Sequence, residues 1–162
     1  MPTLTLLRDD RGLVAAAVVE GETLLATSLG YDERKTMMDA IRRSGGEARL
    51  ARDAIGLEVC SKLLRAACGE RVKFNYRLSL TRLSPLAKKI LRLVQGIPRG
   101  ETVDYAELAR RAGVHPRAVG RILSLNPYPL IIPCHRVVMA DGRLGGYSLG
   151  PRLKARILEA EG

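Results

Sequence analysis

The chain has 162 residues, of which 46% are hydrophobic and 27% charged, so it is long enough for one ordinary domain or two small ones with a proper core. Its formal net charge of +10 is typical of proteins with a polyanionic partner, most often nucleic acid, although a basic but merely solvated surface is the alternative. No apolar run is long enough to cross a membrane and the chain does not open on a signal-peptide pattern, so we expect no membrane partner and a cytoplasmic, nucleoid-associated protein.

The first half of the chain, residues 1–80, is predicted to be a small α/β domain. Three β-leaning runs are separated by turn signals, and two helical stretches and one alternating segment follow them. In chain order these are strands at 3–7, 13–19 and 23–29, helices at 33–43 and 47–67, and a strand or linker at 72–80. We expect the second helical stretch to break near Gly56.

The second half, residues 81–162, is predicted to be helical and rich in turns, which makes the whole chain an α+β protein. Ser84 followed by Pro85 is an N-cap with proline in the first turn of a helix. Two further helices, 105–112 and 117–125, are joined by a short turn that contains glycine. This is the outline of a helix-turn-helix, with His115 as a turn or capping residue, and a last amphipathic helix covers 152–161.

The second helix of this pair has features that suit DNA. Ala118 and Gly120 are small and allow close approach to another backbone, while Arg117 and Arg121 lie four residues apart on one face. Such a face fits phosphate contact or insertion into a groove. The alternative is a solvated basic face on an ordinary helical hairpin.

Cysteine usage argues against disulfides and metals. Cys60 and Cys68 belong to one helical stretch, where eight residues separate the Cα atoms by about 12 Å, too far for a bridge. We expect both in the core of a protein from a reducing compartment. Because the Cys-x-x-Cys and His-x-x-His spacings are absent, we expect no metal site and no cofactor.

The third cysteine has the surroundings of a reactive thiol. Cys134 lies between Pro133 and His135, with Arg136 next, and nearby positive charge favours the thiolate that acts as a nucleophile. For an isolated Cys-His pair, a buried cysteine ahead of a Val-Val core segment is the competing interpretation. Ten residues later the chain has two glycines and two hydroxyl side chains that are able to line a pocket: Gly145, Gly146, Tyr147 and Ser148.

Together these motifs resemble the alkylguanine-DNA alkyltransferases, also called methylated-DNA–protein-cysteine methyltransferases. The resemblance covers about residues 84–162 and is specific in order and spacing. It rests on Ile97-Pro98-x-Gly100, Tyr105-x-x-Leu108-Ala109, Arg117-Ala118-Val119-Gly120, Asn126-Pro127, Ile132-Pro133-Cys134-His135-Arg136-Val137, Gly145-Gly146-Tyr147, Gly150, Lys154 and Glu161.

The resemblance implies a reaction and a role for each residue. Cys134 would attack the alkyl carbon on the exocyclic oxygen of guanine, His135 would deprotonate it through a water, and Glu161 would orient His135. Around the target base, the resemblance implies that Tyr147 donates to the leaving guanine, that Ser148, Gly145 and Gly146 hold the base edge, and that Asn126 braces the active-site turn. On the DNA, it implies that Arg117 replaces the extruded nucleotide in the stack and that Tyr105 presses on the backbone near the target phosphate. The other residues implied to contact DNA are Ala118, Gly120, Arg121 and Arg136.

The resemblance also implies minor-groove docking on double-stranded DNA that contains O6-alkylguanine, and base flipping by a monomer that is consumed after one repair. The Cys and His ligands for the structural zinc of some family members are absent. Three alternatives stay open: an alkyltransferase-like damage sensor without transfer, a helix-turn-helix regulator with a structural thiol, and a cysteine hydrolase with repeated turnover.

Overall fold

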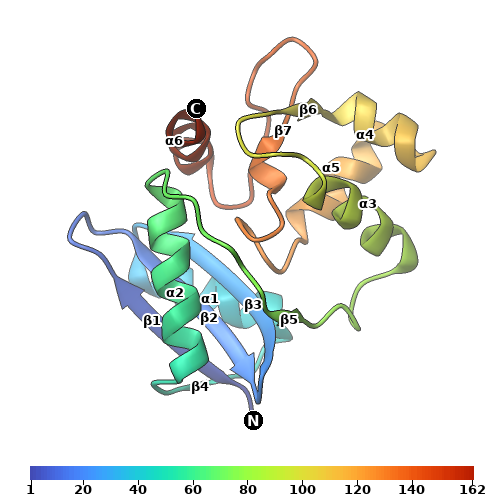
Figure 1. Ribbon diagram of the computed structural model, residues 1–162. Helices are drawn as coiled ribbons and strands as arrows, with labels where there is room; N and C mark the ends of the chain where they lie inside the picture. Colours follow the sequence, from blue (N-terminus) through green and yellow to red (C-terminus); the bar gives the residue numbers. More distant parts are fainter. The chain divides into compact units, whose positions relative to one another are not determined.

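The computed structural model describes all residues, 1–162, and divides into two compact units. Unit 1 contains Met1–Ser79 together with Pro127–Pro129, and unit 2 contains Leu80–Asn126 and Leu130–Gly162. The predicted α+β class is confirmed (Figure 1). None of the helices has the length and apolar character needed to cross a membrane.

Unit 1 is built on a five-stranded sheet with the strand order β4-β1-β2-β3-β5. The long strands β1 (Thr3–Arg8), β2 (Val14–Glu20) and β3 (Thr23–Gly30) form an antiparallel meander, as the three β-leaning runs predict. Two short edge strands, β4 (Arg49–Leu50) and β5 (Arg77–Leu78), pair in parallel with β1 and β3.

Two helices cover this sheet on opposite faces, with α2 (Ala54–Ala67) in front of it and α1 (Glu33–Ser44) behind it in Figure 1. The arrangement explains why β2 is a continuous small apolar run rather than an alternating one. A central strand that is covered on both faces has no solvent side, and every residue of β2 except Glu20 is buried.

The expected helix over 47–67 is wrong in its first turns, because α2 begins only at Ala54. Asp53 is the N-cap, and its Oδ1 accepts a hydrogen bond of 2.9 Å from the Gly56 amide. Gly56 therefore does not break the helix. A Cβ at this position would lie 2.5 Å from Thr5 Oγ1, so the glycine lets α2 approach β1 closely.

The two cysteines of α2 have different surroundings. Cys60 is fully buried against the sheet, and burial raises the pKa of its thiol to about 12. Cys68 follows the last turn of α2 and is exposed, so its expected place in the core is wrong. None of the three cysteines forms a disulfide.

A three-residue piece of the second half of the chain, Pro127–Pro129, forms part of unit 1. Tyr128 is fully buried, and its hydroxyl lies 2.8 Å from the Leu24 carbonyl and 2.6 Å from the Ser79 carbonyl. Thr27 donates its amide to the Pro127 carbonyl at 2.9 Å. The hydrophobic pattern does not predict this insertion, because it depends on hydrogen bonds across about a hundred residues of sequence.

Unit 2 is helical, as predicted, and its helix starts follow from capping. Helix α3 (Pro85–Gln95) is capped by Ser84, and α4 (Tyr105–Ala112) by Asp104. His115 Nδ1 accepts from the Arg117 amide at 3.1 Å and caps α5 (Pro116–Ser124), which confirms its predicted place. Gly113, with φ of 73°, makes the turn between α4 and α5.

The remaining elements of unit 2 surround Cys134. A single 3-10 turn covers Cys134–Arg136 and leads into β7 (Val137–Val138), which pairs in parallel with β6 (Val103–Asp104). Helix α6 (Pro151–Glu161) ends the chain. The two-residue strands and the 3-10 turn are too short to produce a periodic pattern, so the sequence does not predict them.

We predict that Tyr128→Phe lowers the free energy of unfolding by about 1–3 kcal/mol, because the O–H donor within reach of the Leu24 and Ser79 carbonyls at this point is lost. The measurement is equilibrium denaturation in urea. Tyr76→Phe is the control, since its hydroxyl makes an exposed hydrogen bond to Glu58 and its loss should change stability by no more than about 0.5 kcal/mol. Equal effects of both substitutions would contradict the anchoring role of Tyr128.

Candidate active site

Cys134 lies against a cavity of about 410 Å³ within unit 2. The residue is 3% exposed, so only a group that enters the cavity reaches its sulfur. Helices α4 and α5, the 3-10 turn and the loop before α6 all contribute to the wall. The lining residues are Tyr105, Gly120, Leu123, Ser124, Cys134, Gly146, Tyr147 and Ser148.

Asn126 holds the cysteine sulfur directly. Its Nδ2 lies 3.2 Å from Cys134 Sγ and 3.0 Å from the Ile132 carbonyl, and the side chain is fully buried. Since an amide N–H that points at sulfur stabilises the thiolate more than the thiol, Asn126 both braces the turn and favours the nucleophilic form.

A buried carboxylate orients His135. The ring nitrogen Nε2 lies 2.6 Å from Glu161 Oε1, and both side chains are at least 90% inaccessible to solvent. Burial lowers the pKa of His135, although Glu161 opposes the shift. Burial alone would raise the pKa of Glu161, but hydrogen bonds from His135 and Arg136 hold it at about 2.

These shifts define the protonation state of the pair at neutral pH. Glu161 is ionised and His135 is neutral, so the hydrogen on the ring sits on Nε2 and is donated to the carboxylate. The other nitrogen, Nδ1, then has a free lone pair, and this buried atom has no hydrogen-bond partner in the protein. A neutral imidazole that donates a hydrogen bond from one nitrogen and keeps the lone pair of the other unused is able to act as a base.

Arg136 is turned inward rather than toward a partner molecule. Its Nε lies 3.0 Å from Glu161 Oε2, its Nη2 also contacts that oxygen, and its Nη1 lies 2.9 Å from the Ile97 carbonyl. The guanidinium therefore stabilises the ionised Glu161. This geometry places Arg136 on Glu161 and on the Ile97 carbonyl, while the DNA contact that the resemblance implies for it stays a prediction.

Lys154 fastens the loop that follows β7, a role that the sequence analysis missed. The side chain is fully buried, and its Nζ lies 2.7 Å from the Val137 carbonyl, 3.1 Å from the Gly146 carbonyl and within hydrogen-bond distance of the Leu144 carbonyl. Burial lowers its pKa to about 8, against a small opposing effect of Cys134. One signal was available: Lys154 shares the buried face of α6 with Leu153 and Ile157.

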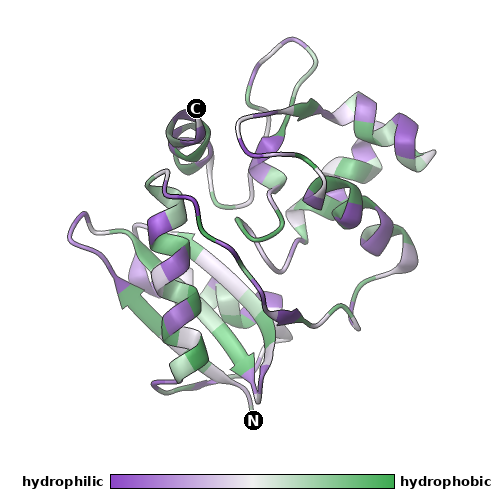
Figure 2. Cartoon of the chain, in the orientation of Figure 1, coloured by the Kyte–Doolittle hydropathy of each residue, from purple (hydrophilic) through white to green (hydrophobic).

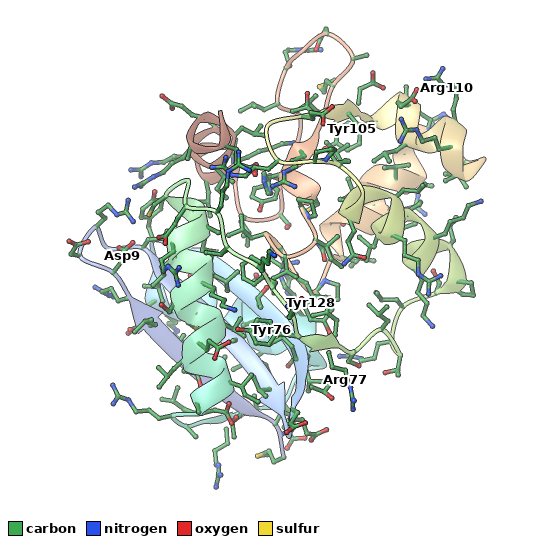
Figure 3. All side chains as sticks on the ribbon, in the orientation of Figure 1. Asp9, Tyr76, Arg77, Tyr105, Arg110 and Tyr128 are labelled. Carbon is green, nitrogen blue, oxygen red and sulfur yellow. The ribbon has the colours of Figure 1, made fainter.

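The same loop brings the predicted pocket residues together. Tyr105 donates its hydroxyl to the Gly146 carbonyl at 3.1 Å, and Tyr105 is labelled in Figure 3. Gly145 has a φ of 73°, and a Cβ there would lie 3.0 Å from the Tyr105 ring, so the close approach requires glycine. Tyr147 lies edge-on to His135 with 6.4 Å between the ring centroids, and Ser148 is exposed beside the cavity.

Helix α5 presents cations that no carboxylate neutralises. Arg117 and Arg121 are both exposed and form no salt bridge, in contrast to Arg110 and Arg111 of α4, which both pair with Glu107. Ala118 and Gly120 lie between these two arginines in sequence, and a Cβ on Gly120 would meet nothing within 4 Å. The helix thus combines free positive charge with open space beside the cavity.

No group of three or more His, Cys, Asp or Glu side chains is gathered in a way that would hold a metal ion. The site consists of a buried cysteine, an imidazole oriented by a carboxylate, and a cavity next to a basic helix.

Comparison with known proteins identifies the class of this site. The family model for the DNA-binding domain of 6-O-methylguanine DNA methyltransferase matches residues 85–162. The methylated-DNA–protein-cysteine methyltransferase of Metallosphaera sedula is 36% identical over 136 residues, which cover 84% of this chain and 85% of that protein. The chain therefore belongs to the methylated-DNA–protein-cysteine methyltransferase family, and the resemblance seen in the motifs is confirmed.

Two further comparisons define the extent of the likeness. The enzyme of the same name from Methanothermobacter thermautotrophicus is 53% identical over 75 residues, which cover 46% of this chain and 43% of that protein, so the chain matches less than half of that relative's length. The crystal structure of O6-methylguanine-DNA methyltransferase from Pyrococcus kodakaraensis superposes with a TM-score of 0.81 at 27% identity, and covers 99% of both chains. The likeness in fold therefore extends to the first half, where motifs are lacking.

We predict that Lys154→Met lowers the free energy of unfolding by at least about 2 kcal/mol, because three loop carbonyls lose a buried donor. It should also slow the reaction of Cys134 with free O6-benzylguanine by at least about tenfold, since the loop wall of the cavity is no longer fixed. Urea denaturation and single-turnover kinetics are the measurements. Glu159→Met, on the exposed side of α6, should change neither, and an unchanged Lys154→Met variant would show that the loop is held without this lysine.

Proposed function

We propose that the protein repairs DNA by transferring the alkyl group of O6-alkylguanine to Cys134, with each molecule acting once. The observation that carries the proposal is the arrangement around the sulfur: Asn126 donates to it, and the neighbouring His135 is a neutral, oriented base. A transcription regulator has no need of this arrangement.

Access to the sulfur requires that the target base leaves the duplex. Cys134 is 3% exposed in a cavity whose volume lies in the usual range for small-molecule sites, so a stacked base does not reach it. Flipping a nucleotide costs a few kcal/mol. Arg117 fills the gap in the stack, Tyr105 presses on the backbone near the target phosphate, and Ala118 and Gly120 let α5 approach the minor groove closely, with Arg121 on a phosphate.

The chemistry then follows from the groups in place. His135 Nδ1 removes the proton of Cys134 through a water molecule, and Glu161 stabilises the imidazolium that forms. The thiolate attacks the alkyl carbon, a carbon–sulfur bond forms, and the carbon–oxygen bond breaks with its electron pair on guanine. Tyr147 supplies the hydrogen bond or proton that the leaving guanine needs, while Ser148 and the Gly145–Gly146 backbone hold the base edge.

The reaction stops at this point. The product is a thioether, and none of the side chains at the cavity is equipped to remove an alkyl group from sulfur. The protein acts as a monomer on double-stranded DNA, without a cofactor, and works at the nucleoid. The family model, which describes a DNA-binding domain, and the relatives named for methylated DNA support this partner.

We predict that incubation with DNA that contains O6-methylguanine adds one methyl group to Cys134, as read by intact-mass and peptide mass spectrometry. Cys134→Ala should abolish the transfer and keep DNA binding, because the phosphate contacts come from other residues. Cys68→Ala, which removes the exposed thiol, should react like the wild type. Methylation of Cys134→Ala would refute the assignment, and binding without any transfer by the wild type would identify a damage sensor.

We predict that Arg117→Ala slows repair of duplex DNA by at least about tenfold, which corresponds to losing about 1.4 kcal/mol of compensation for unstacking. The reaction with free O6-benzylguanine should keep its rate, because no stack has to be refilled. Single-turnover rates on both substrates are compared with those of Arg92→Ala, an exposed arginine on α3. Equal slowing of Arg117→Ala on both substrates would mean that Arg117 supports the fold of the site instead.

A further inference from the structure

The segment that leads from α2 to β5 has a regular division between its two sides. Accessibility alternates along residues 71–78, with every second side chain exposed. The exposed residues are Arg71, Lys73, Asn75 and Arg77, and the half-buried ones are Val72, Phe74, Tyr76 and Leu78. Such alternation is the mark of an extended chain with one face on the protein and one in solvent.

Two hydrogen bonds to α2 hold the segment in this register. Lys62 of α2 donates to the Lys73 carbonyl at 3.0 Å, and the Tyr76 hydroxyl donates to Glu58, one turn earlier on the same helix. The segment therefore runs back along α2, as Figure 1 shows, before Arg77–Leu78 pairs with β3. Figure 3 labels Tyr76 on the side of α2 and Arg77 beyond it.

The exposed side of the segment carries positive charge without a counter-charge. Arg71, Lys73 and Arg77 form no salt bridge. The two nearby carboxylates already have other partners: Glu58 contacts Tyr76 and Lys62, and Glu70 pairs with Arg65. Figure 2 shows the hydrophilic colour of residues along this segment and at β5. We call these three cations the basic strip.

The basic strip is a local feature and does not follow from the charge of unit 1 as a whole. Residues 1–79 contain 13 Lys and Arg and 11 Asp and Glu, a net charge of only +2. Three uncompensated cations on one side of eight residues are therefore concentrated in an otherwise balanced unit. Repulsion among these three cations lowers the stability of the fold slightly. A surface that binds an anion is expected to carry such unpaired charge.

We propose that the basic strip binds the sugar–phosphate backbone of duplex DNA, as a second contact in addition to α5. Alternate residues of an extended chain lie about 6.6 Å apart, which is close to the axial rise of two nucleotides in a duplex, about 3.4 Å each. The Tyr76 ring is engaged by Lys62 and Glu58 of α2, and Phe74 is half-buried, so the strip contacts phosphates and does not stack on bases. The choice of DNA as the polyanion rests on the proposed function.

The test is the dependence of DNA affinity on salt. Each phosphate contact contributes about 0.9 to the slope of log affinity against log salt for duplex DNA. Replacing Arg71, Lys73 and Arg77 by Gln should therefore lower the slope by about 2.7. Between about 50 and 200 mM NaCl, the wild type should lose about 40-fold more affinity for undamaged duplex than this variant.

The matched control removes the same charge from the same unit. Arg34, Lys35 and Arg49 are exposed and form no salt bridge, and their replacement by Gln should leave the slope near the wild-type value. Melting curves establish that both variants are folded. Equal slopes for the two triple variants would overturn the proposal and leave an acidic protein as the partner of the strip.

A gain of function provides a second, independent measurement. Asn75 occupies the uncharged position in the exposed row, so Asn75→Lys should raise the slope by about 0.9. Met38→Lys, which adds a charge at an exposed position of α1, should raise it less. If both lysines act equally, the effect comes from net charge and the strip makes no contact.

These measurements separate the strip from the proposed function. The strip variant should react with free O6-benzylguanine at the wild-type rate, because the cavity around Cys134 contains none of its residues. A wild-type protein that transfers no alkyl group would refute the proposed function, while the salt slopes on undamaged DNA would still decide whether the strip binds phosphate.

Discussion

The buried carboxylate of Glu161 is the interaction on which the geometry of unit 2 depends. It accepts hydrogen bonds from His135 and Arg136, which belong to the 3-10 turn, and Arg136 in turn reaches the Ile97 carbonyl. A buried charge is unfavourable unless it is paired on several sides, so the carboxylate holds three segments in one arrangement. Arg99 adds weaker contacts to the last carbonyls of α6, where positive charge is favoured by the helix dipole.

The last turn of α6 carries this carboxylate and is held by ion pairing and burial, because Glu161 is 8% exposed. The orientation of the His135 ring therefore depends on the last turn of α6. Loss of the last turn would leave His135 without its anchor and Arg136 without its counter-charge.

The sequence predicts what depends on local rules. Strands β1 to β3 and helices α1, α3, α4, α5 and α6 lie within a few residues of their predicted positions, since capping and apolar spacing are local signals. The sequence also singles out Cys134, its histidine neighbour and the glycines of the cavity loop, because they follow one another closely in the chain. Their roles came from the family resemblance and not from spacing.

What the sequence did not predict depends on contacts between distant residues. The start of α2 at Ala54 follows from pairing of Arg49–Leu50 with β1, and the place of Tyr128 in unit 1 follows from bonds to Leu24 and Ser79. Leu130 adopts a φ of 78°, a strained value for leucine that no pattern indicates. Lys154 and Arg136 appear as ordinary cations in sequence, and only the structure shows that their donors are directed at loop carbonyls and at Glu161.

The few aromatic residues illustrate how this aliphatic protein places its loops. With one Phe and no Trp, the core is filled mainly by Leu, Ile, Val and Ala. Tyr128, Tyr105 and Tyr76 each use a hydroxyl to hold a segment without regular structure, at backbone carbonyls or at a carboxylate. A tyrosine ring fills space while its hydroxyl bonds at a defined point, so one side chain supplies both packing and register. The irregular segments of this fold, including the loop beside Cys134, are therefore positioned by polar contacts as well as by buried apolar side chains such as Leu130 and Ile132.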